Sequence, residues 1–129
     1  MALGGTNFNL NCSPESQTYH VFPYTIGSGV TKTAGEMALI EDTVGVFVEA
    51  GVAGEEITFC YKAERITVPC AVVATGTYIP GSKVYFDATE AEVTETAGSN
   101  QLCGIVVKQP SLGDEVVMID LDGTLGIVA

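Results

Sequence analysis

Closely spaced turn residues divide the chain into short β-forming runs, which limits it to a fold built from many short strands. Residues 83–87, 101–108 and 115–121 are each rich in Val, Ile, Tyr or Phe. Gly, Pro, Asn or Asp borders each of these runs. Residues 56–69 form the longest run, and only residues 88–97 could form a helix. The pattern predicts an all-β protein of about eight to ten short strands, in a small β-barrel or sandwich.

A strand–turn–strand pattern occurs twice along the chain. Gly45-Val-Phe-Val is followed by Gly54 nine residues after the first glycine, and Gly104-Ile-Val-Val is followed by Gly113 at the same spacing. Residues 35–40 also resemble residues 81–86, although chance similarity is an alternative in a chain rich in Gly and Val. Repeated units usually pack in the same way, so we expect Gly45 and Gly104 to occupy equivalent places. The aliphatic residues expected to point the same way relative to the core are Val46 and Val48, and Ile105 and Val107.

The first 30 residues differ in character from the rest of the chain. Residues 1–18 are polar and rich in Gly, Asn and Ser, whereas residues 19–26 are strand-like, with Pro23 excluding them from a central sheet position. We interpret residues 1–30 as an extended N-terminal arm and residues 31–129 as a single β-domain. A polar segment of this kind cannot order itself alone, so we expect its large side chains to make assembly contacts. These side chains belong to Leu3, Phe8, Leu10, Tyr19, Phe22 and Tyr24.

The chain is strongly acidic. Sixteen acidic and five basic residues give a net charge of −11. This charge argues against binding to nucleic acid or to anionic membranes, which both attract Lys and Arg. It could also serve only to keep an apolar-rich domain soluble. No apolar run reaches the length of about 18 residues that a membrane helix needs, and residues 1–15 lack the basic start and apolar segment of a signal peptide.

The cysteines and the single histidine do not form a recognisable metal site. Cys12, Cys60, Cys70 and Cys103 contain no C-x-x-C pair, and His20 is the only histidine. We therefore expect no metal and no cofactor. Cys60 and Cys70 could face each other if residues 61–69 fold back, or they could be buried free thiols, which a reducing compartment favours.

The most specific catalytic motif is VMIDLDGTLG at residues 117–126. It resembles the first motif of haloacid-dehalogenase-type phosphatases, in which one Asp attacks phosphorus and the next acts as acid and base beside Mg²⁺. That family continues into an α/β domain, whereas only five residues follow Thr124 here. We interpret Asp120 to Gly123 as a strand end and a tight turn. Since the chain has neither a G-x-S-x-G motif nor a P-loop, we expect it not to be an enzyme.

Seven short motifs follow one another in a fixed order between residues 35 and 114. They are Gly35-Glu-Met-Ala-Leu-Ile, Val44-Gly-Val-Phe-Val, Ala53-Gly-Glu-Glu, Pro80-Gly-Ser-Lys-Val-Tyr-Phe-Asp, Glu92-Val-Thr, Cys103-Gly-Ile-Val-Val and Gly113-Asp. In this order the chain resembles the capsid cement (decoration) proteins of tailed bacteriophages. It is similar in particular to the group once labelled "predicted phage recombinase, RecA/RadA family". The absent P-loop argues against the ATP-driven strand exchange that this label implies.

The resemblance implies a structural role on the virion. Such proteins sit on the outside of an expanded head, commonly as trimers, and tie neighbouring copies of the major capsid protein together against the pressure of packaged DNA. By this resemblance the chain would be made in the host cytoplasm and would bind the major capsid protein and itself. The alternative is a non-catalytic sandwich that binds sugar on a virion or cell surface. That alternative predicts an exposed aromatic platform, and a chain with no Trp and few aromatic residues is poorly suited to one.

Overall fold

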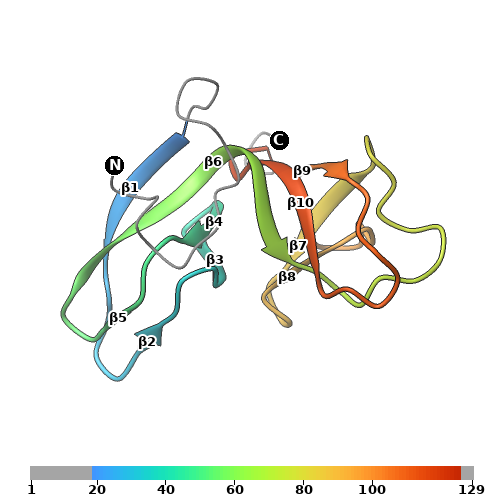
Figure 1. Ribbon diagram of the computed structural model, residues 1–129. Helices are drawn as coiled ribbons and strands as arrows, with labels where there is room; N and C mark the ends of the chain where they lie inside the picture. The colour runs from blue at the N-terminus through green and yellow to red at the C-terminus, as the bar shows by residue number, and fades with distance from the viewer. Residues whose placement is uncertain (1–18, 126–129) are drawn as a thin grey trace.

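The computed structural model describes residues 19–125, and in this range it contains ten β-strands and no helix. The all-β prediction is therefore confirmed, with a nearly closed antiparallel sheet. Figure 1 shows the strands arranged in two lobes. The strands are β1 (Tyr19–Thr25), β2 (Thr31–Lys32), β3 (Met37–Ile40), β4 (Thr43–Phe47), β5 (Gly51–Val52), β6 (Glu56–Pro69), β7 (Lys83–Asp87), β8 (Glu92–Thr94), β9 (Gln101–Lys108) and β10 (Val116–Asp122).

β6 joins the two lobes, because its 14 residues run from one into the other (Figure 1). Its first part pairs with β1 and β4, and its later part pairs with β10. The main sheet has the order β3-β4-β6-β10-β9-β7-β8, and β2 pairs with β5 in a second small sheet. We call β1 to β5 with the first part of β6 the first lobe. The rest of β6 with β7 to β10 is the second lobe.

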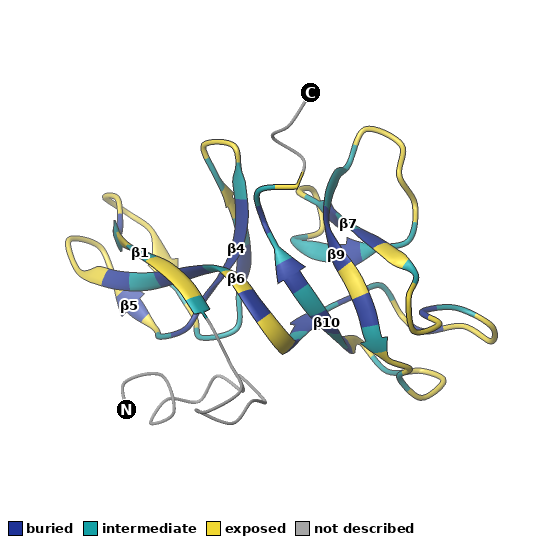
Figure 2. Cartoon of the chain, turned by 90° about the horizontal axis from the view of Figure 1, so that it is seen from above, coloured by how far each residue is buried: buried dark blue, intermediate teal, exposed yellow. Residues whose placement is uncertain are grey.

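Two clusters of buried apolar side chains form the hydrophobic core of the protein. The aromatic cluster lies in the first lobe and consists of Ile26, Phe47, Ile57 and Phe59. The larger aliphatic cluster fills the second lobe, with Ile66, Val106 and Ile119 among its members. No polar or charged residue is fully buried between residues 19 and 125. Figure 2 shows buried and more exposed residues alternating along β10, as expected for strands with one face toward a core.

The two lobes make matching backbone hydrogen bonds where their central strands begin. The Gly35 N–H donates to the Phe47 carbonyl at 2.7 Å, and the Gly81 N–H donates to the Val106 carbonyl at 2.7 Å. In each lobe Phe47 or Val106 donates a return bond to the residue after the glycine. These bonds set β4 of the first lobe in the same relation to β3 as β9 has to β7.

A second matched set of bonds closes the turn before the next strand. The Gly54 N–H donates to the Ile26 carbonyl, and the Gly113 N–H donates to the Val73 carbonyl, both at 2.9 Å. Ile26 and Val73 each donate in return to the acidic residue after the glycine. The φ angles of Gly54 and Gly113 are 89° and 87°, a conformation that favours glycine.

Gly45 and Gly104 lie at matching places in these two arrangements. A Cβ atom on Gly45 would collide with the carbonyl oxygen of Cys60, and one on Gly104 would collide with the carbonyl oxygen of Asp120. In both lobes the next strand therefore approaches the backbone too closely for any residue except glycine.

The side chains after the two glycines differ in burial. Val46 and Val48 are 0% exposed, whereas Ile105 is 41% exposed and Val107 is half-buried. The matched bonds place Ile105 and Val107 on the same side of β9 as Val46 and Val48 have on β4, but only Val46 and Val48 are buried. The reason is that the back of β4 faces the aliphatic cluster of the second lobe, while the back of β9 lies at the surface.

Residues 19–25 differ from the expected arm because they form a strand of the sheet. β1 pairs with β6 along its whole length, from Tyr19 opposite Ala63 to Thr25 opposite Glu56. Pro23 is tolerated because, among the strands between residues 19 and 125, β6 alone pairs with β1. The domain thus extends ahead of the expected boundary at residue 30. The remaining arm, with Leu3, Phe8 and Leu10, lies outside the described residues.

Candidate functional site

The carboxylates of the phosphatase-like motif are both engaged in local structure. Asp120 Oδ1 accepts a hydrogen bond from the Arg65 N–H at 3.0 Å. Asp122 Oδ1 accepts bonds from the Thr124 N–H at 3.0 Å and from the Thr124 hydroxyl at 2.6 Å. The Lys62 ammonium lies 3.6 Å from the other Asp122 oxygen. The motif therefore ends strand β10 and shapes the turn after it.

The charge state of Asp122 agrees with a structural role. Partial burial acts to raise the pKa of this carboxyl, but the hydrogen bonds from Thr124 and the charge of Lys62 outweigh it and lower the pKa. A catalytic acid would need a raised pKa instead.

Two of the buried thiols, those of Cys70 and Cys103, are poor nucleophiles. Cys60, Cys70 and Cys103 are buried and form no disulfide. Burial, followed by the nearby charges of Glu92 and other acidic groups, raises the pKa of Cys70 to about 11, and burial raises that of Cys103 to about 12. A reactive cysteine has a lowered pKa, so these thiols act as small apolar core groups.

No constellation of ligands for a metal ion occurs among residues 19–125. His20 is exposed on β1, and its ring lies 6.0 Å from the ring of Tyr61. The exposed large apolar side chains of the described range are all aliphatic, and its Phe and Tyr side chains are half-buried or buried. The same residues contain no helix that could cross a membrane.

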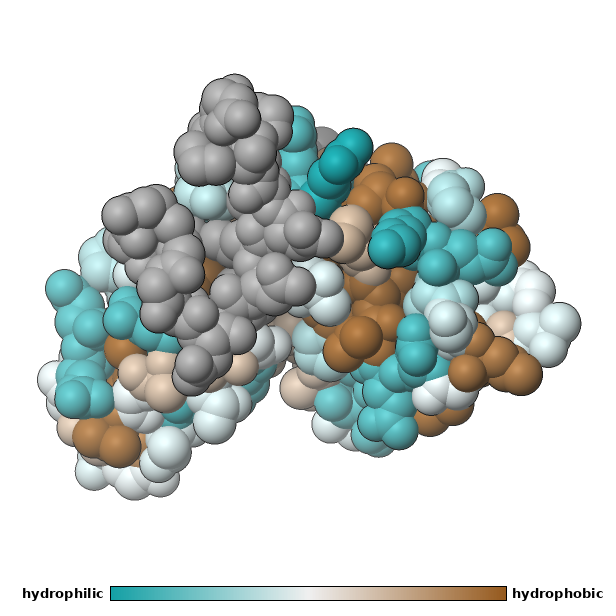
Figure 3. Space-filling view, in the orientation of Figure 1, coloured by the Kyte–Doolittle hydropathy of each residue, from teal (hydrophilic) through white to brown (hydrophobic). Residues whose placement is uncertain are grey.

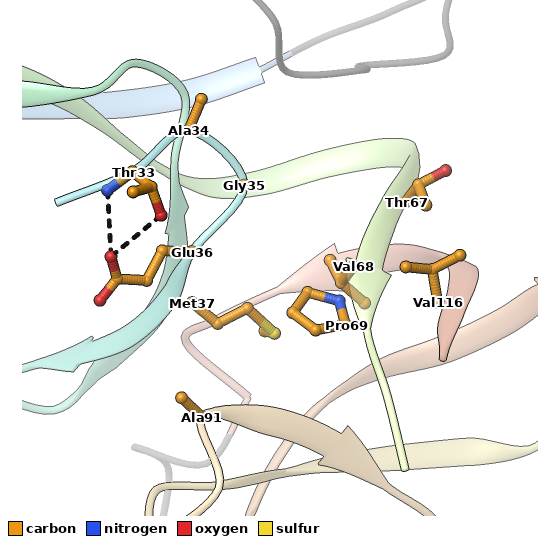
Figure 4. A pocket seen from close by; sticks show the side chains of 10 residues that line it. All are labelled: Thr33, Ala34, Gly35, Glu36, Met37, Thr67, Val68, Pro69, Ala91 and Val116. Atoms are coloured by element: carbon orange, nitrogen blue, oxygen red, sulfur yellow. Dashed lines mark hydrogen bonds between the residues drawn. The ribbon is translucent and has the colours of Figure 1, made fainter. Parts of the chain in front are cut away.

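A groove of about 460 Å³ lies between the two lobes (Figure 4). Met37 and Ala34 line it on the side of the first lobe, and Val68, Pro69 and Val116 line it on the side of the second. Its one carboxylate, on Glu36, accepts a bond from the Thr33 N–H at 3.0 Å, so this acid caps the local turn. The groove holds no pair of groups arranged for acid–base or nucleophilic chemistry.

The second lobe carries an exposed apolar stripe, which we call the outer face. It consists of Ile105 and Val107 on β9 and Val116 and Met118 on β10, and the carboxylate of Asp120, on the same side of β10, borders it beside Ile105. Val116 is 49% exposed and Ile105 is 41% exposed. Figure 3 shows apolar surface gathered on this lobe between hydrophilic patches. A contiguous exposed apolar surface of this kind marks an interaction site.

Basic residues border the outer face. Lys83 lies opposite Ile105, and Lys108 lies opposite Met118 across the strands, so each base shares a face with its apolar neighbour. Arg65 lines a surface hollow together with Val107, Lys108 and Met118, and two acids, Glu64 and Asp120, line the same hollow. Three of the five basic residues of an acidic chain thus surround one apolar stripe.

The structure places half of the predicted contact residues on β1. Phe22 and Tyr24 pack on the aromatic cluster, with ring centroids 5.1 Å from Phe59 and 5.3 Å from Phe47. Tyr19 packs against the aliphatic cluster. Their role in assembly stays a prediction. The outer face was missed from the sequence, because its alternating apolar residues look the same as a strand that faces a core.

A comparison with protein families connects this fold to a known group. The model of a family described as phage cement protein matches residues 16–121 of the chain. The match covers both lobes, including β1 and nearly all of β10. No curated protein and no solved structure shows significant similarity to the chain.

Proposed function

The chain belongs to the phage cement protein family, and we propose that it binds the outer surface of a phage head and clamps neighbouring copies of the major capsid protein. The observation that carries this proposal is the family match over residues 16–121, which covers nearly the whole described fold. A structural role also suits a domain whose acidic motif and buried thiols are engaged in folding rather than chemistry.

We assign capsid attachment in part to the arm ahead of β1. Residues 1–18 directly precede β1, which pairs only with β6 among the described strands, and an extended segment next to such a strand can add to the sheet of a neighbour. Burial of one anchor such as Phe8 would contribute about 1.5–3 kcal/mol. In a homotrimer three arms would act together, and avidity would then make attachment far tighter than one arm allows.

The test is binding of the purified protein to expanded, undecorated heads. Wild-type protein should saturate the heads and raise the temperature at which they break. Deletion of residues 1–18 should leave a folded domain that decorates heads weakly or not at all.

A matched pair of variants separates the apolar anchors from the arm as a whole. Phe8→Ala with Leu10→Ala should lower occupancy, whereas Asn7→Ala with Asn9→Ala should not. Unchanged occupancy after deletion of residues 1–18 would show that the β-domain alone attaches to the capsid. Absence of binding by the wild-type protein would refute the cement role.

A further inference from the structure

The side of β4 that carries Val46 and Val48, which we call the back of β4, is the counterpart of the outer face in the first lobe. It is covered by another part of the same chain. Val46 and Val48 on this back are fully buried and belong to the aliphatic cluster with Ile66 and Ile119 of the second lobe. The two lobes are also joined there by backbone, because the Val44 N–H donates to the Gly123 carbonyl at 3.1 Å. The first lobe thus uses the back of its central strand to cap the core of the second.

The matching surface of the second lobe has no such neighbour among the described residues. The matched hydrogen bonds place Ile105 and Val107 on β9 where Val46 and Val48 lie on β4. These side chains form part of the outer face, and Ile105 is 41% exposed. Within residues 19–125 the chain therefore supplies a capping surface that none of these residues covers.

In the first lobe, part of the core lacks full cover. Its aromatic cluster is bordered by side chains that remain only half-buried, including Ile40, Tyr24 and Tyr61. In the second lobe the matching core is capped by the back of β4. The aromatic cluster is thus a core in need of the kind of cap that the outer face provides.

Charge favours contact between these two surfaces. Three bases, Arg65, Lys83 and Lys108, and two acids, Glu64 and Asp120, border the outer face, so its border carries one net positive charge. Residues 19–61 of the first lobe contain six acidic residues and one basic residue, Lys32, which pairs with Glu36 at 3.4 Å. Complementary charges of this kind steer and orient an association between proteins.

We propose that the outer face of the second lobe packs on the half-buried border of the aromatic cluster in a second copy of this chain. The contact is head-to-tail, because it joins two different surfaces, and such contacts close into rings when the rotation between copies permits. The inference deepens the self-association included in the proposed function by naming its surfaces, and it does not depend on binding to the capsid.

The first experiment measures the association of the full chain by sedimentation velocity over a wide range of concentration. Wild-type protein should form a closed oligomer. Ile105→Glu with Val107→Glu should weaken association about 100-fold or more, because it places acids against an acidic lobe. The matched control is Leu112→Glu, which changes an apolar residue that is 71% exposed in a loop, and it should shift association less than about threefold.

The second experiment tests the head-to-tail geometry by mixing. Ile40→Glu should abolish association through the other surface, and Lys83→Glu should weaken it without touching an apolar contact. Thermal melting must show that each variant folds. An equal mixture of Ile40→Glu with the Ile105→Glu, Val107→Glu variant should form a heterodimer, since these two chains can still make one intact contact.

Three outcomes would overturn the inference. They are a monomeric wild-type protein at all concentrations, a wild-type oligomer in Ile105→Glu with Val107→Glu, and no heterodimer in the mixture. Head binding, measured separately, distinguishes this failure from failure of the cement role. A protein that associates as expected but never binds heads refutes the cement role alone.

Discussion

Replacement of Gly123 by alanine should open the junction between the lobes. A Cβ atom at this position would collide with the backbone oxygen, carbon and nitrogen of Val44. A backbone cannot move aside as the end of a flexible side chain can, so the two segments must separate. The Gly123 N–H donates to the Tyr61 carbonyl at 2.7 Å, and the Gly123 carbonyl accepts from Val44 at 3.1 Å, so both bonds are at risk.

The expected loss of stability follows from these contacts. Two backbone hydrogen bonds contribute about 0.5–1.5 kcal/mol each. Val44 is 0% exposed, and full burial of a Val side chain contributes about 1.5–3 kcal/mol, part of which would be lost on separation. We therefore expect Gly123→Ala to lower the free energy of unfolding by about 3–4 kcal/mol. For a domain of this size that corresponds to a fall in Tm of roughly 10–15 °C.

The assay is urea denaturation together with calorimetric melting, with Gly27→Ala as the control. Gly27 has no heavy atom within 4 Å of the added Cβ, so the same chemical change should be neutral or stabilise by about 0.4–1 kcal/mol. If Gly123→Ala melted within about 2 °C of the wild-type protein, the close approach of these strands could not be a main source of stability.

Four further predictions concern single side chains. No Mg²⁺-dependent hydrolysis of a generic phosphate ester should be detected by phosphate release, and turnover that disappeared in Asp120→Asn would contradict this. Asp122→Asn should lower stability at pH 7 by about 1 kcal/mol in urea titrations. Because the pKa of Asp122 is lowered in the fold, this stabilisation exists above the unfolded pKa and should be lost as the pH falls through the lowered pKa. A difference between the two proteins that did not shrink with falling pH would refute the cause. Glu92→Gln should change stability in the opposite direction, because burial and then Glu90 and other acidic neighbours raise the pKa of Glu92. The wild-type protein should therefore gain stability as the pH falls, and the variant should be more stable than the wild type only near neutral pH. Cys103, whose pKa burial raises to about 12, should remain unmodified by a thiol reagent at pH 8 until the protein unfolds, as mass spectrometry would show.

The fold class and the family were predictable because both depend on local signals. Turn glycines and short β-branched runs are read one segment at a time, and the structure confirms strands at residues 83–87 and 101–108. The family match confirms the resemblance that the ordered motifs indicated.

The features that could not be predicted depend on which distant segments of the chain pack against each strand. Val46 and Ile105 have similar local sequence, but only Val46 has a lobe behind it. Phe22 looked like a free anchor of an arm because its partner, Phe59, lies far along the chain. The candidate outer face on β9 and β10 needed the pairing of distant strands before its residues could be placed together.

The shared strand β6 has a mechanical consequence for a protein held at both ends. β6 belongs to both lobes, so a force that separates the lobes acts along its covalent backbone as well as on the non-covalent contacts between them. The bonds from β1 and β10 to β6 lie across the strand, and such a pull would shear many of them at once instead of opening them one by one. We therefore expect the domain to resist tension applied between its two lobes.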